Sequence, residues 1–540
     1  MNATNRNSGS MPLLNTSAIK SARWSMVQLF VTGFFAFALA ACNQSRSTAV
    51  GVDGFQAAMT KVLEECQLDS TENIQSYVHI DNGPAQLQTM QDDGTAIIVL
   101  DLYEGQEVRV ELILETATES VLLATATTTV PGPESGDTIR FEPNQFITQC
   151  GLQNPAGFNL AWGGPRNLFT NSRPLVGSPA LNERGLIVLN GSPLDGLPMR
   201  VLAFDTSGNN QSWPAHPEYE AAIPRRQVAI DQFGTVYSYQ TINSEQGIRL
   251  LALNTNGEII ASYENNAGGE LRTAPSILAS GEIVYPASTS EVGISSDLPN
   301  PEIVNIGTFG NVHSKGAISR REIVYYTLTG SQGILAFDVP SRQRVANISC
   351  LPDSGSRSSP AIDSNDNVIF GTDGGTVYSC DSELRQNWNT AVTIQDADYF
   401  QDSPVIDSAD NIYIRSNNGN IYSLTSEGSL RWVFRTGITV SRNSGIATPI
   451  LTSQNSFIYT DSSAVTALNM EDGSLKWRFT GENDRTFIDA NNAVTLTPDG
   501  ILVFRAGTSL LGVQVNETIS ETAAWPKWGA DLQNTGRAPQ

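Results

Sequence analysis

From about residue 158 to its end, the chain repeats a pattern of short apolar segments separated by polar turns. Three copies align at Pro360, Pro404 and Pro449, which lie 44 and 45 residues apart. Each proline is followed by two short apolar segments with a turn rich in glycine or serine between them, and then by a tryptophan. Short apolar segments bounded by turn residues predict β-strands, so each repeat is expected to form a small sheet.

Weaker copies precede and follow these three. The pattern predicts eight repeats, which begin near residues 179, 228, 275, 316, 360, 404, 449 and 492. A period in the mid-forties with about four strands per unit is typical of β-propeller blades, each of which buries its faces only against its neighbours. We therefore expect an all-β fold over residues 158–540, an eight-bladed β-propeller.

The repeat resembles the quinoprotein-type (PQQ-like) propeller repeat. The resemblance is strongest at residues 406–407, 411–413, 418–424 and 428–432. In this repeat the glycine gives a tight turn between the two outer strands, and the tryptophan is expected to dock on the adjacent blade. The tryptophans expected to dock in this way are Trp213, Trp388, Trp432 and Trp477. Residues 528–539 resemble the segment by which members of this family close the ring, and residues 162–174 look like a diverged copy of it.

The first 41 residues predict a bacterial lipoprotein signal peptide. Three basic and no acidic side chains precede an apolar stretch over residues 26–41, which is too short to span a bilayer comfortably. It ends in Leu-Ala-Ala before Cys42, which matches the lipobox, so Cys42 is expected to become the lipidated N-terminus. A plain secretory signal with a coincidental cysteine is the alternative. Asn43 and Gln44 after the cysteine favour the outer membrane, facing the periplasm, with the cell surface as the other location.

Between the signal and the propeller, the sequence predicts a tether over residues 42–52 and a small helix-plus-sheet module over residues 53–150. Apolar residues at i, i+3, i+4, i+7, i+8 and i+11 predict a helix whose buried face is made by Phe55, Ala58, Met59, Val62, Leu63 and Cys66. Alternating runs at 96–102, 108–114 and 121–130 predict strands. The module is either a spacer that lifts the propeller off the membrane or a binding domain.

Four cysteines follow Cys42, and an even number in an oxidising compartment favours two disulfides. Four cysteines allow three connectivities. The pairing of Cys66 with Cys150 and of Cys350 with Cys380 keeps each bridge local. The first disulfide would link two segments of the small module covalently, and the second would link one repeat to the next.

The charge balance excludes nucleic acids as partners. The chain has 32 basic and 55 acidic residues, for a net charge of −23. Such a surface repels phosphate backbones and offers few sites for counterion release.

The resemblance implies one enzymatic function to consider, because active quinoproteins hold pyrroloquinoline quinone and calcium in the funnel of an eight-bladed ring. Those enzymes typically place two adjacent cysteines against the cofactor, and no two cysteines are adjacent here. Asp363 and Asp407 begin runs that resemble the opening of a calcium loop, but aspartate between strands more often caps a turn. No catalytic, cofactor-binding or metal-binding residue is predicted.

We therefore interpret the chain as a non-catalytic, monomeric envelope lipoprotein that acts as a protein-binding scaffold through the loops of a rigid ring. Its signal, repeat type and blade number resemble the propeller lipoproteins of the outer-membrane β-barrel assembly machinery. This resemblance implies envelope proteins or assembly components as partners, with membrane contact through the lipid anchor only. A PQQ-dependent periplasmic dehydrogenase and a surface ligand-binding lipoprotein are the alternatives.

Overall fold

The computed structural model describes residues 46–539, with gaps at 53–54, 67, 69–73, 81–85, 89–94, 103–104, 116–119, 131–137, 142–144, 154, 156–157, 164–178, 192–199, 215–227, 243–246, 266–273, 297, 310, 330–332, 346–348, 392–398, 401, 437–448, 461–463, 481–493 and 507–508. Cys42 and the signal peptide predicted over residues 1–41 lie outside the described residues. Within the described part the fold is mostly β-strand, with one short helix. That helix is neither long nor apolar enough to cross a bilayer.

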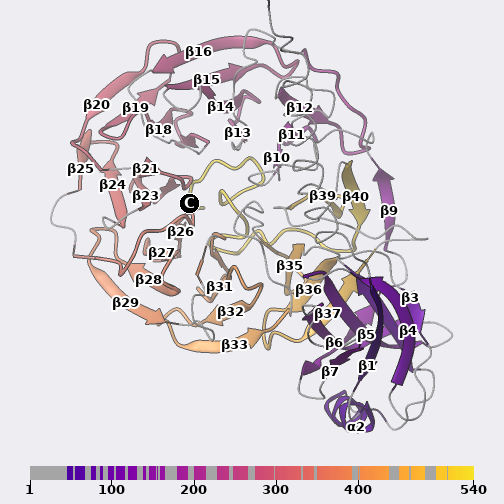
Figure 1. The fold of residues 1–540 in the computed structure, drawn as a ribbon. Helices are drawn as coiled ribbons and strands as arrows, with labels where there is room; N and C mark the ends of the chain where they lie inside the picture. The colour runs from indigo at the N-terminus through magenta and orange to yellow at the C-terminus, as the bar shows by residue number, and fades with distance from the viewer. Residues whose placement is uncertain are drawn as a thin grey trace, which may run out of the picture.

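Small antiparallel sheets follow one another around a ring, each with its first strand near the axis (Figure 1). In the order of the chain, the first four sheets comprise β10 (Ala180–Leu181), β11 (Ile187–Gly191) and β12 (Arg200–Phe204); β13 (Val228–Ile230), β14 (Val236–Ile242), β15 (Gly247–Leu253) and β16 (Ile259–Asn265); β17 (Ser276–Ile277), β18 (Ile283–Pro286), β19 (Glu291–Ser295) and β20 (Glu302–Asn305); and β21 (Asn311–Val312), β22 (Ala317–Ile318), β23 (Ile323–Thr329), β24 (Ile334–Asp338) and β25 (Gln343–Arg344).

The ring continues with four further sheets. They comprise β26 (Ala361–Ile362), β27 (Val368–Gly371), β28 (Thr376–Cys380) and β29 (Gln386–Ala391); β30 (Val405–Ile406), β31 (Ile412–Arg415), β32 (Ile421–Leu424) and β33 (Leu430–Phe434); β34 (Ile450–Leu451), β35 (Ser456–Thr460), β36 (Val465–Asn469) and β37 (Leu475–Phe479); and β38 (Thr495–Leu496), β39 (Ile501–Ala506), β40 (Ser509–Gln514) and β9 (Asn159–Gly163). The fold is thus an all-β propeller.

The prediction of an eight-bladed propeller is wrong, because seven blades are complete. Within the described residues, seven blades have four or more strands, whereas the first repeat forms the three-stranded sheet β10-β11-β12. In the described residues, the place of its fourth strand holds one bridge, between Phe204 and Asn210. Residues 215–227, which follow, lie outside the described part. Two residues explain this shortening. Ser212 is an extra residue before the tryptophan and has φ +53°, and Pro214, just after the tryptophan, has no N–H to donate to a ladder.

The ring closes through β9, which pairs antiparallel with β40 from Leu511↔Gly163 to Gln514↔Asn159. Residues 162–163, predicted to belong to a diverged closing segment, therefore supply the outer strand of the last blade. Residues 528–539, predicted to close the ring, lie at its axis instead.

Residues 518–539, which we call the axial segment, run across the inner strands at the middle of the ring (Figure 1, yellow). Six innermost strands each donate one backbone N–H to a carbonyl of this segment, over 2.6–2.9 Å. The pairs are Leu181 to Leu532, Ile230 to Gln533, Ile277 to Thr535, Ile318 to Gly536, Ile406 to Trp525 and Leu451 to Pro526. Trp525 and Trp528 are 2% and 0% exposed, so the segment is part of the core.

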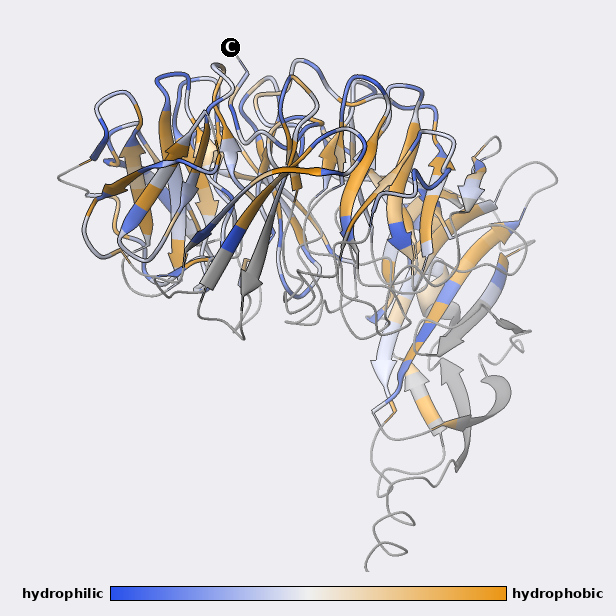
Figure 2. Cartoon of the chain, turned by 90° about the horizontal axis from the view of Figure 1, so that it is seen from above, coloured by the Kyte–Doolittle hydropathy of each residue, from blue (hydrophilic) through white to orange (hydrophobic). Residues whose placement is uncertain are grey.

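The amino-terminal module contains α2 (Phe55–Glu65) and two sheets, and it extends beyond one face of the propeller (Figure 2). The smaller sheet has the order β4 (Thr95–Leu102), β1 (Arg46–Val52), β7 (Thr138–Phe141). The larger one contains β3 (Gln86–Gln88), β2 (Ile74–Ile80), β5 (Glu107–Glu115), β6 (Ser120–Thr129) and β8 (Ile147–Gln153).

Two features of this module differ from a tethered, separate domain. Residues 46–52 were expected within the tether, but as β1 they pair with strands on both sides, so this range is not a free linker. In addition, β8 pairs in parallel with β37, which joins the larger sheet to a propeller blade as one nine-stranded sheet.

Both predicted disulfides are confirmed. Cys66, after α2, is bonded to Cys150 in β8 with an S–S distance of 2.04 Å. Cys350, which follows β25, is bonded to Cys380 in β28 and so links one blade to the next.

The regular spacing of glycine and tryptophan has a simple steric basis in the blade contacts. The ring of Trp388 lies against Gly428 of the next blade, where a Cβ would come within 2.6 Å of the indole. The indole N–H of Trp388 donates to the carbonyl of Ser426 over 2.9 Å. The ring of Trp432 packs in the same way against Gly473, and the ring of Trp213 against Gly257.

The remaining two tryptophans of this kind serve the last blade. Trp477 donates from its indole N–H to Glu517 Oε1 over 2.9 Å, and the ring of Phe158 packs edge-on against it. Trp162, in β9, docks on Gly208 of the first repeat and donates to the carbonyl of Thr206 over 2.9 Å. The sequence analysis placed Trp162 in a diverged closing segment and did not assign this role to it.

We expect Gly428→Ala to destabilise the protein by about 3 kcal/mol, because a left-handed backbone costs an alanine about 1–2 kcal/mol and the added methyl also overlaps Trp388. Gly307 is a matched control, since its φ is +78° against +83° for Gly428 but no atom lies within 4 Å of its added Cβ. Gly307→Ala should therefore show only the backbone cost. Urea unfolding followed by tryptophan fluorescence measures both, and equal losses would contradict the steric account.

Candidate functional site

Two lysines are buried at the axis. Lys315 precedes β22 and Lys527 belongs to the axial segment, and they are 2% and 0% exposed. Lys315 Nζ donates to the carbonyl of Pro275 over 2.5 Å and lies 5.6 Å from the ring centre of Trp528. Lys527 Nζ donates to the carbonyl of Asp531 over 3.1 Å and to Asn534 Oδ1. Each amine is thus held by oxygen acceptors inside the ring.

Burial lowers the pKa of both lysines to about 7. The Asp531 carboxylate opposes this shift for both, and the nearby charge of Lys527 adds to it for Lys315. A neutral amine keeps two N–H donors, so the hydrogen bonds of Lys527 survive loss of its proton.

Quinone and calcium do not fit these residues. The axis, where the resemblance places the cofactor, is filled by the axial segment with Trp525 and Trp528 buried in it. In the part of the chain that is described, no group of three or more His, Cys, Asp or Glu side chains could hold a metal ion. The four cysteines that follow Cys42 are bonded in disulfides. We therefore assign no reaction step to pyrroloquinoline quinone or to calcium.

The two calcium-like runs are turns between strands. Asp363 Oδ1 accepts from the N–H groups of Asn365 and Asn367, both over 2.8 Å. Asp407 Oδ1 likewise accepts from the N–H groups of Ala409 and Asn411. Burial raises the pKa of Asp363, against the hydrogen bonds that favour its charged form. These carboxylates cap their own backbone, which is the usual structural role of such motifs.

A buried ion-pair cluster joins the amino-terminal module to the propeller. Glu111 in β5 accepts from Arg478 in β37 over 2.6 Å, and Arg109 lies 3.2 Å from the same carboxylate oxygen. All three side chains are at most 5% exposed. One carboxylate therefore lies between two guanidinium groups at the junction.

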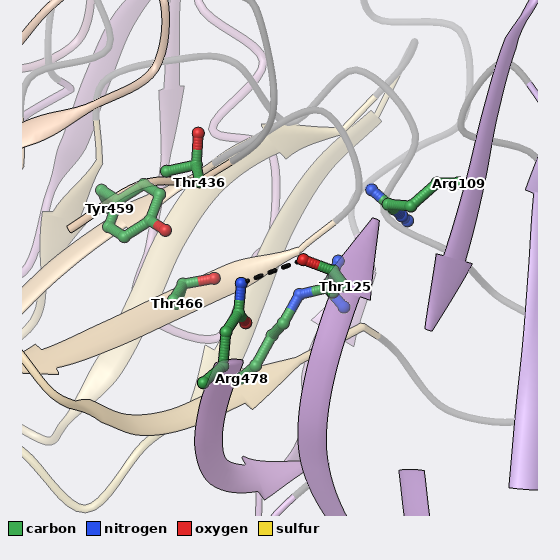
Figure 3. A pocket seen from close by; sticks show the side chains of 7 residues that line it. Arg109, Thr125, Thr436, Tyr459, Thr466 and Arg478 are labelled. Carbon is green, nitrogen blue, oxygen red and sulfur yellow. Dashed lines mark hydrogen bonds between the residues drawn. The ribbon is translucent and has the colours of Figure 1, made fainter. Parts of the chain in front are cut away.

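The cluster borders a very small cavity between the two parts (Figure 3). Arg109 and Arg478 line it together with Thr125, Gln149, Thr436, Tyr459 and Thr466, and Gln149 donates to Thr125 Oγ1 over 3.2 Å. Its volume of about 10 Å³ is room for a single water at most. This cavity is thus too small for a substrate.

Apolar packing supports the same junction. Ile113 and Leu122 of the module belong to one buried cluster with Trp432, Phe434 and Leu475 of the propeller. Gly151 in β8 lies so close to Leu475 that a Cβ would come within 2.3 Å of its side chain. Nothing in the sequence indicated this contact, because its partners are more than 300 residues apart.

The predicted site residues that the structure describes make structural contacts, and two of them, Trp432 and Trp477, lie at the junction itself. Trp213, Trp388, Trp432 and Trp477 form blade contacts, the four cysteines form the disulfides, and Cys42 lies outside the described residues. Sequence reasoning missed Lys315 and Lys527. One sequence feature could have indicated Lys315. It stands at the repeat position where two other repeats have a serine, Ser359 and Ser403.

Comparison with known proteins supports the PQQ-like repeat. The family model described as outer membrane protein assembly factor BamB matches residues 385–517, which is less than half of the chain. No curated protein shows significant similarity to the sequence.

Solved propellers resemble the fold at low identity. The Dos1 propeller is 11% identical, with a TM-score of 0.47, over 67% of this chain and 98% of that chain. The C-terminal WD40 domain of Sif2 is 10% identical, with a TM-score of 0.45, over 66% of this chain and 98% of that chain. Virginiamycin B lyase from Staphylococcus aureus is 11% identical, with a TM-score of 0.38, over 66% of this chain and 99% of that chain. These likenesses concern the fold alone.

We expect Glu111→Gln to lower the free energy of unfolding by about 3–5 kcal/mol, because it leaves two buried guanidinium groups without their carboxylate. Glu264, which pairs with Arg249 but is 46% exposed, provides the control. Glu264→Gln should cost about 1 kcal/mol or less. Urea unfolding compares the two variants, and a loss for Glu111→Gln no larger than the control would show that the cluster does not hold the module in place.

Stability should rise with pH because of the axial lysines. Their pKa is about 7 in the folded protein and 10.5 for a lysine fully exposed to water, as in an unfolded chain, so between these values the unfolded chain binds more protons. Below this window both states are protonated and the slope vanishes. Thermal unfolding between about pH 7 and pH 10 should show a rising Tm, and Lys527→Met should flatten the rise. An unchanged slope in this variant would contradict the assignment.

Proposed function

We propose that this protein is a non-catalytic, protein-binding scaffold of the bacterial cell envelope. The observation that carries the proposal is the filled axis. Six inner strands bind the axial segment through their backbones, so the chain itself occupies the place where a cofactor would lie. The rim and the connecting loops of the ring are then the surfaces left for binding, and propellers commonly bind proteins through such surfaces.

The partners we propose are components of outer-membrane protein assembly. This is supported by the match of residues 385–517 to the family of outer membrane protein assembly factor BamB. The matched range begins before β29 and ends after β40, and it includes β37, on which β8 is added. The part of the chain most like that family is therefore also the part that carries the amino-terminal module.

We further propose that Cys42 is lipidated and that the protein lies at the outer membrane, facing the periplasm. β1 begins at Arg46, so only three residues separate Cys42 from a strand held on both sides. Three extended residues reach about 10 Å. A lipid on Cys42 would therefore keep the module close to the bilayer, with the propeller attached to it through the continuous sheet.

The test uses affinity-tagged full-length protein in cells, with chemical cross-linking before membranes are dissolved. We expect the barrel subunit of the assembly machinery to co-purify with the wild type, and an unrelated tagged lipoprotein to capture none. Cys42→Ser should move the protein from the membrane fraction to the soluble envelope fraction.

Three outcomes would overturn parts of this proposal. Failure to cross-link any assembly component would reject the partners. Membrane retention of Cys42→Ser would reject lipid anchoring, and digestion by protease added to intact cells would place the protein on the cell surface. Stoichiometric binding of pyrroloquinoline quinone with calcium, measured by absorbance and calorimetry, would reject the non-catalytic function.

A further inference from the structure

Two large apolar side chains are exposed on one blade. Within the described residues, four large apolar side chains are exposed, Phe233, Ile260, Leu351 and Leu430. Phe233 and Ile260 are 73% and 58% exposed, and both belong to the second repeat, β13 to β16. Single exposed apolar residues are ordinary on a protein surface, whereas several together often mark a binding site. The question is then whether these two lie together.

The connections of this blade place both residues at the same end of its strands. Phe233 lies in the turn between β13 and β14, and Ile260 follows the turn between β15 and β16. Neighbouring strands of the blade are antiparallel. Because the chain reverses at each turn, the first and third turns of such a sheet lie at the same end. Phe233 and Ile260 therefore share one face of the ring.

Ile260 occupies a β-bulge that recurs in the ring. It is the extra residue between Ile259 and Ala261, which pair with consecutive residues of β15. In three other blades the corresponding extra residue is polar, namely Asn387, Arg431 and Lys476. A bulge sets the direction of its side chain. The contacts of the three polar residues therefore indicate where the side chain of Ile260 lies.

The polar bulge residues reach the inner strands and turns of their own blade. Lys476 Nζ donates to the carbonyl of Gln454 over 2.7 Å. Gln454 is the third residue of its turn, as Phe233 is of the turn from Asp231 to Gly234. The side chain at the bulge thus points toward the turn position that Phe233 occupies in the second repeat.

Arg431 shows a second neighbour of the bulge side chain. Its Nη1 donates to Tyr413 Oη over 3.0 Å, and its guanidinium carbon lies 5.9 Å from the centre of the Tyr413 ring. Tyr237 corresponds to Tyr413, because each hydroxyl donates to the aspartate that caps its own turn, over 3.2 Å and 2.8 Å. Ile260 therefore lies near Tyr237 and Phe233. We call these three residues the second-repeat surface.

The turns around this surface carry an excess of carboxylates. In the described turns at this end of the first three repeats, one residue is basic, Arg184. The acidic residues of the same turns are Glu183, Asp205, Asp231, Glu258 and Glu282. A field of this sign attracts basic segments and repels acidic ones. The surface therefore combines an apolar centre with negatively charged surroundings.

We propose that the second-repeat surface binds a basic segment of another protein. Apolar side chains of that segment pack on Phe233 and Ile260, and its lysine or arginine side chains face the surrounding carboxylates. Two apolar replacements carry the proposal. Ile260 stands at a bulge where three other blades have polar residues, and Phe233 stands at a turn position that is polar or alanine in the other seven repeats. This inference rests on the proposed scaffold function and gives that scaffold a docking surface.

The test measures binding of a fluorescein-labelled, end-blocked heptapeptide to the purified full-length protein by fluorescence anisotropy. The peptide has two leucines alternating with three lysines between terminal glycines. Saturable binding is expected. Exchange of the lysines for glutamate, or of the leucines for threonine, should weaken binding at least tenfold. Absence of binding, or equal binding of either altered peptide, would overturn the proposal.

Variants of the protein locate the apolar centre. Phe233→Ser combined with Ile260→Thr removes it, and both side chains are exposed, so the fold should be retained. We expect this double variant to bind the heptapeptide at least tenfold more weakly. Leu351→Ser is the matched control, because Leu351 is 68% exposed but lies next to Cys350 in another part of the ring, and it should bind as the wild type does. Equal binding by the double variant and the wild type would overturn the proposal.

A second pair of variants tests the charge without changing the apolar centre. Glu258→Gln combined with Glu282→Gln removes two carboxylates beside the surface, so binding should weaken at least threefold. Glu427→Gln combined with Glu471→Gln makes the same change in turns of the sixth and seventh repeats and should leave binding unchanged. Equal binding by these two variants would overturn the proposal. Circular dichroism during thermal unfolding shows which variants are folded, and this second comparison stands if the first double variant is not.

The outcomes separate this inference from the proposed function. Peptide binding that depends on Phe233 and Ile260, without capture of assembly components, would support the surface and reject the partners. Capture of those components without peptide binding would overturn the surface and leave the scaffold. A dimer of the wild type in sedimentation that the first double variant dissociates, again without peptide binding, would overturn the proposal in favour of contact between two copies of this chain.

Discussion

The backbone hydrogen bonds between the innermost strands and the axial segment are the constraint on which the ring depends. These inner strands are only two or three residues long, too short to be stable as isolated pairs. A buried N–H without an acceptor is costly, and the carbonyls from Trp525 to Gly536 satisfy six of them. One segment thereby bonds to blades on opposite sides of the ring. The same arrangement buries Lys315 and Lys527 and removes the axis as a place for chemistry.

At the rim, the dominant interaction is the addition of strands. β9 completes the last blade and β8 extends its neighbour, so both attachments of the amino-terminal part use main-chain pairing. The buried Glu111 then fixes the second attachment, because Arg109 and Arg478 approach the same carboxylate oxygen. A sheet that crosses from module to propeller is stiffer than a linker. The two parts are therefore joined at this junction by one continuous sheet.

Much of the propeller could be predicted because each blade is formed by residues that are close together in the sequence. The spacing of Pro360, Pro404 and Pro449 reflects a unit that repeats its own turns, and Cys350 and Cys380 lie in neighbouring units. Cys66 and Cys150 lie within the small amino-terminal module. The shortened first sheet depends on Ser212 and Pro214, whose effect on strand pairing periodicity alone does not reveal.

The axis and the junction could not be predicted in this way, because they depend on pairings between distant segments. A polar strand such as β1 and a charged residue such as Glu111 look like surface features until their partners are known. The sequence likewise does not indicate that Lys315 is buried, because lysine is almost never fully buried unless it is paired. The local sequence pattern therefore predicted the blades. The axial segment and the junction with the amino-terminal module depend on contacts between residues far apart in the sequence.

The closure of the ring by β9 also orders the assembly of the molecule in time. The strand that completes the last blade is made early, and its partner β40 is made about 350 residues later, followed by the axial segment. Until then, an unpaired edge and the innermost N–H groups of several blades lack their acceptors. Contacts of such long sequence separation slow folding and prolong the exposure of aggregation-prone edges. A nascent chain of this protein therefore carries these unpaired groups until the axial segment has been made.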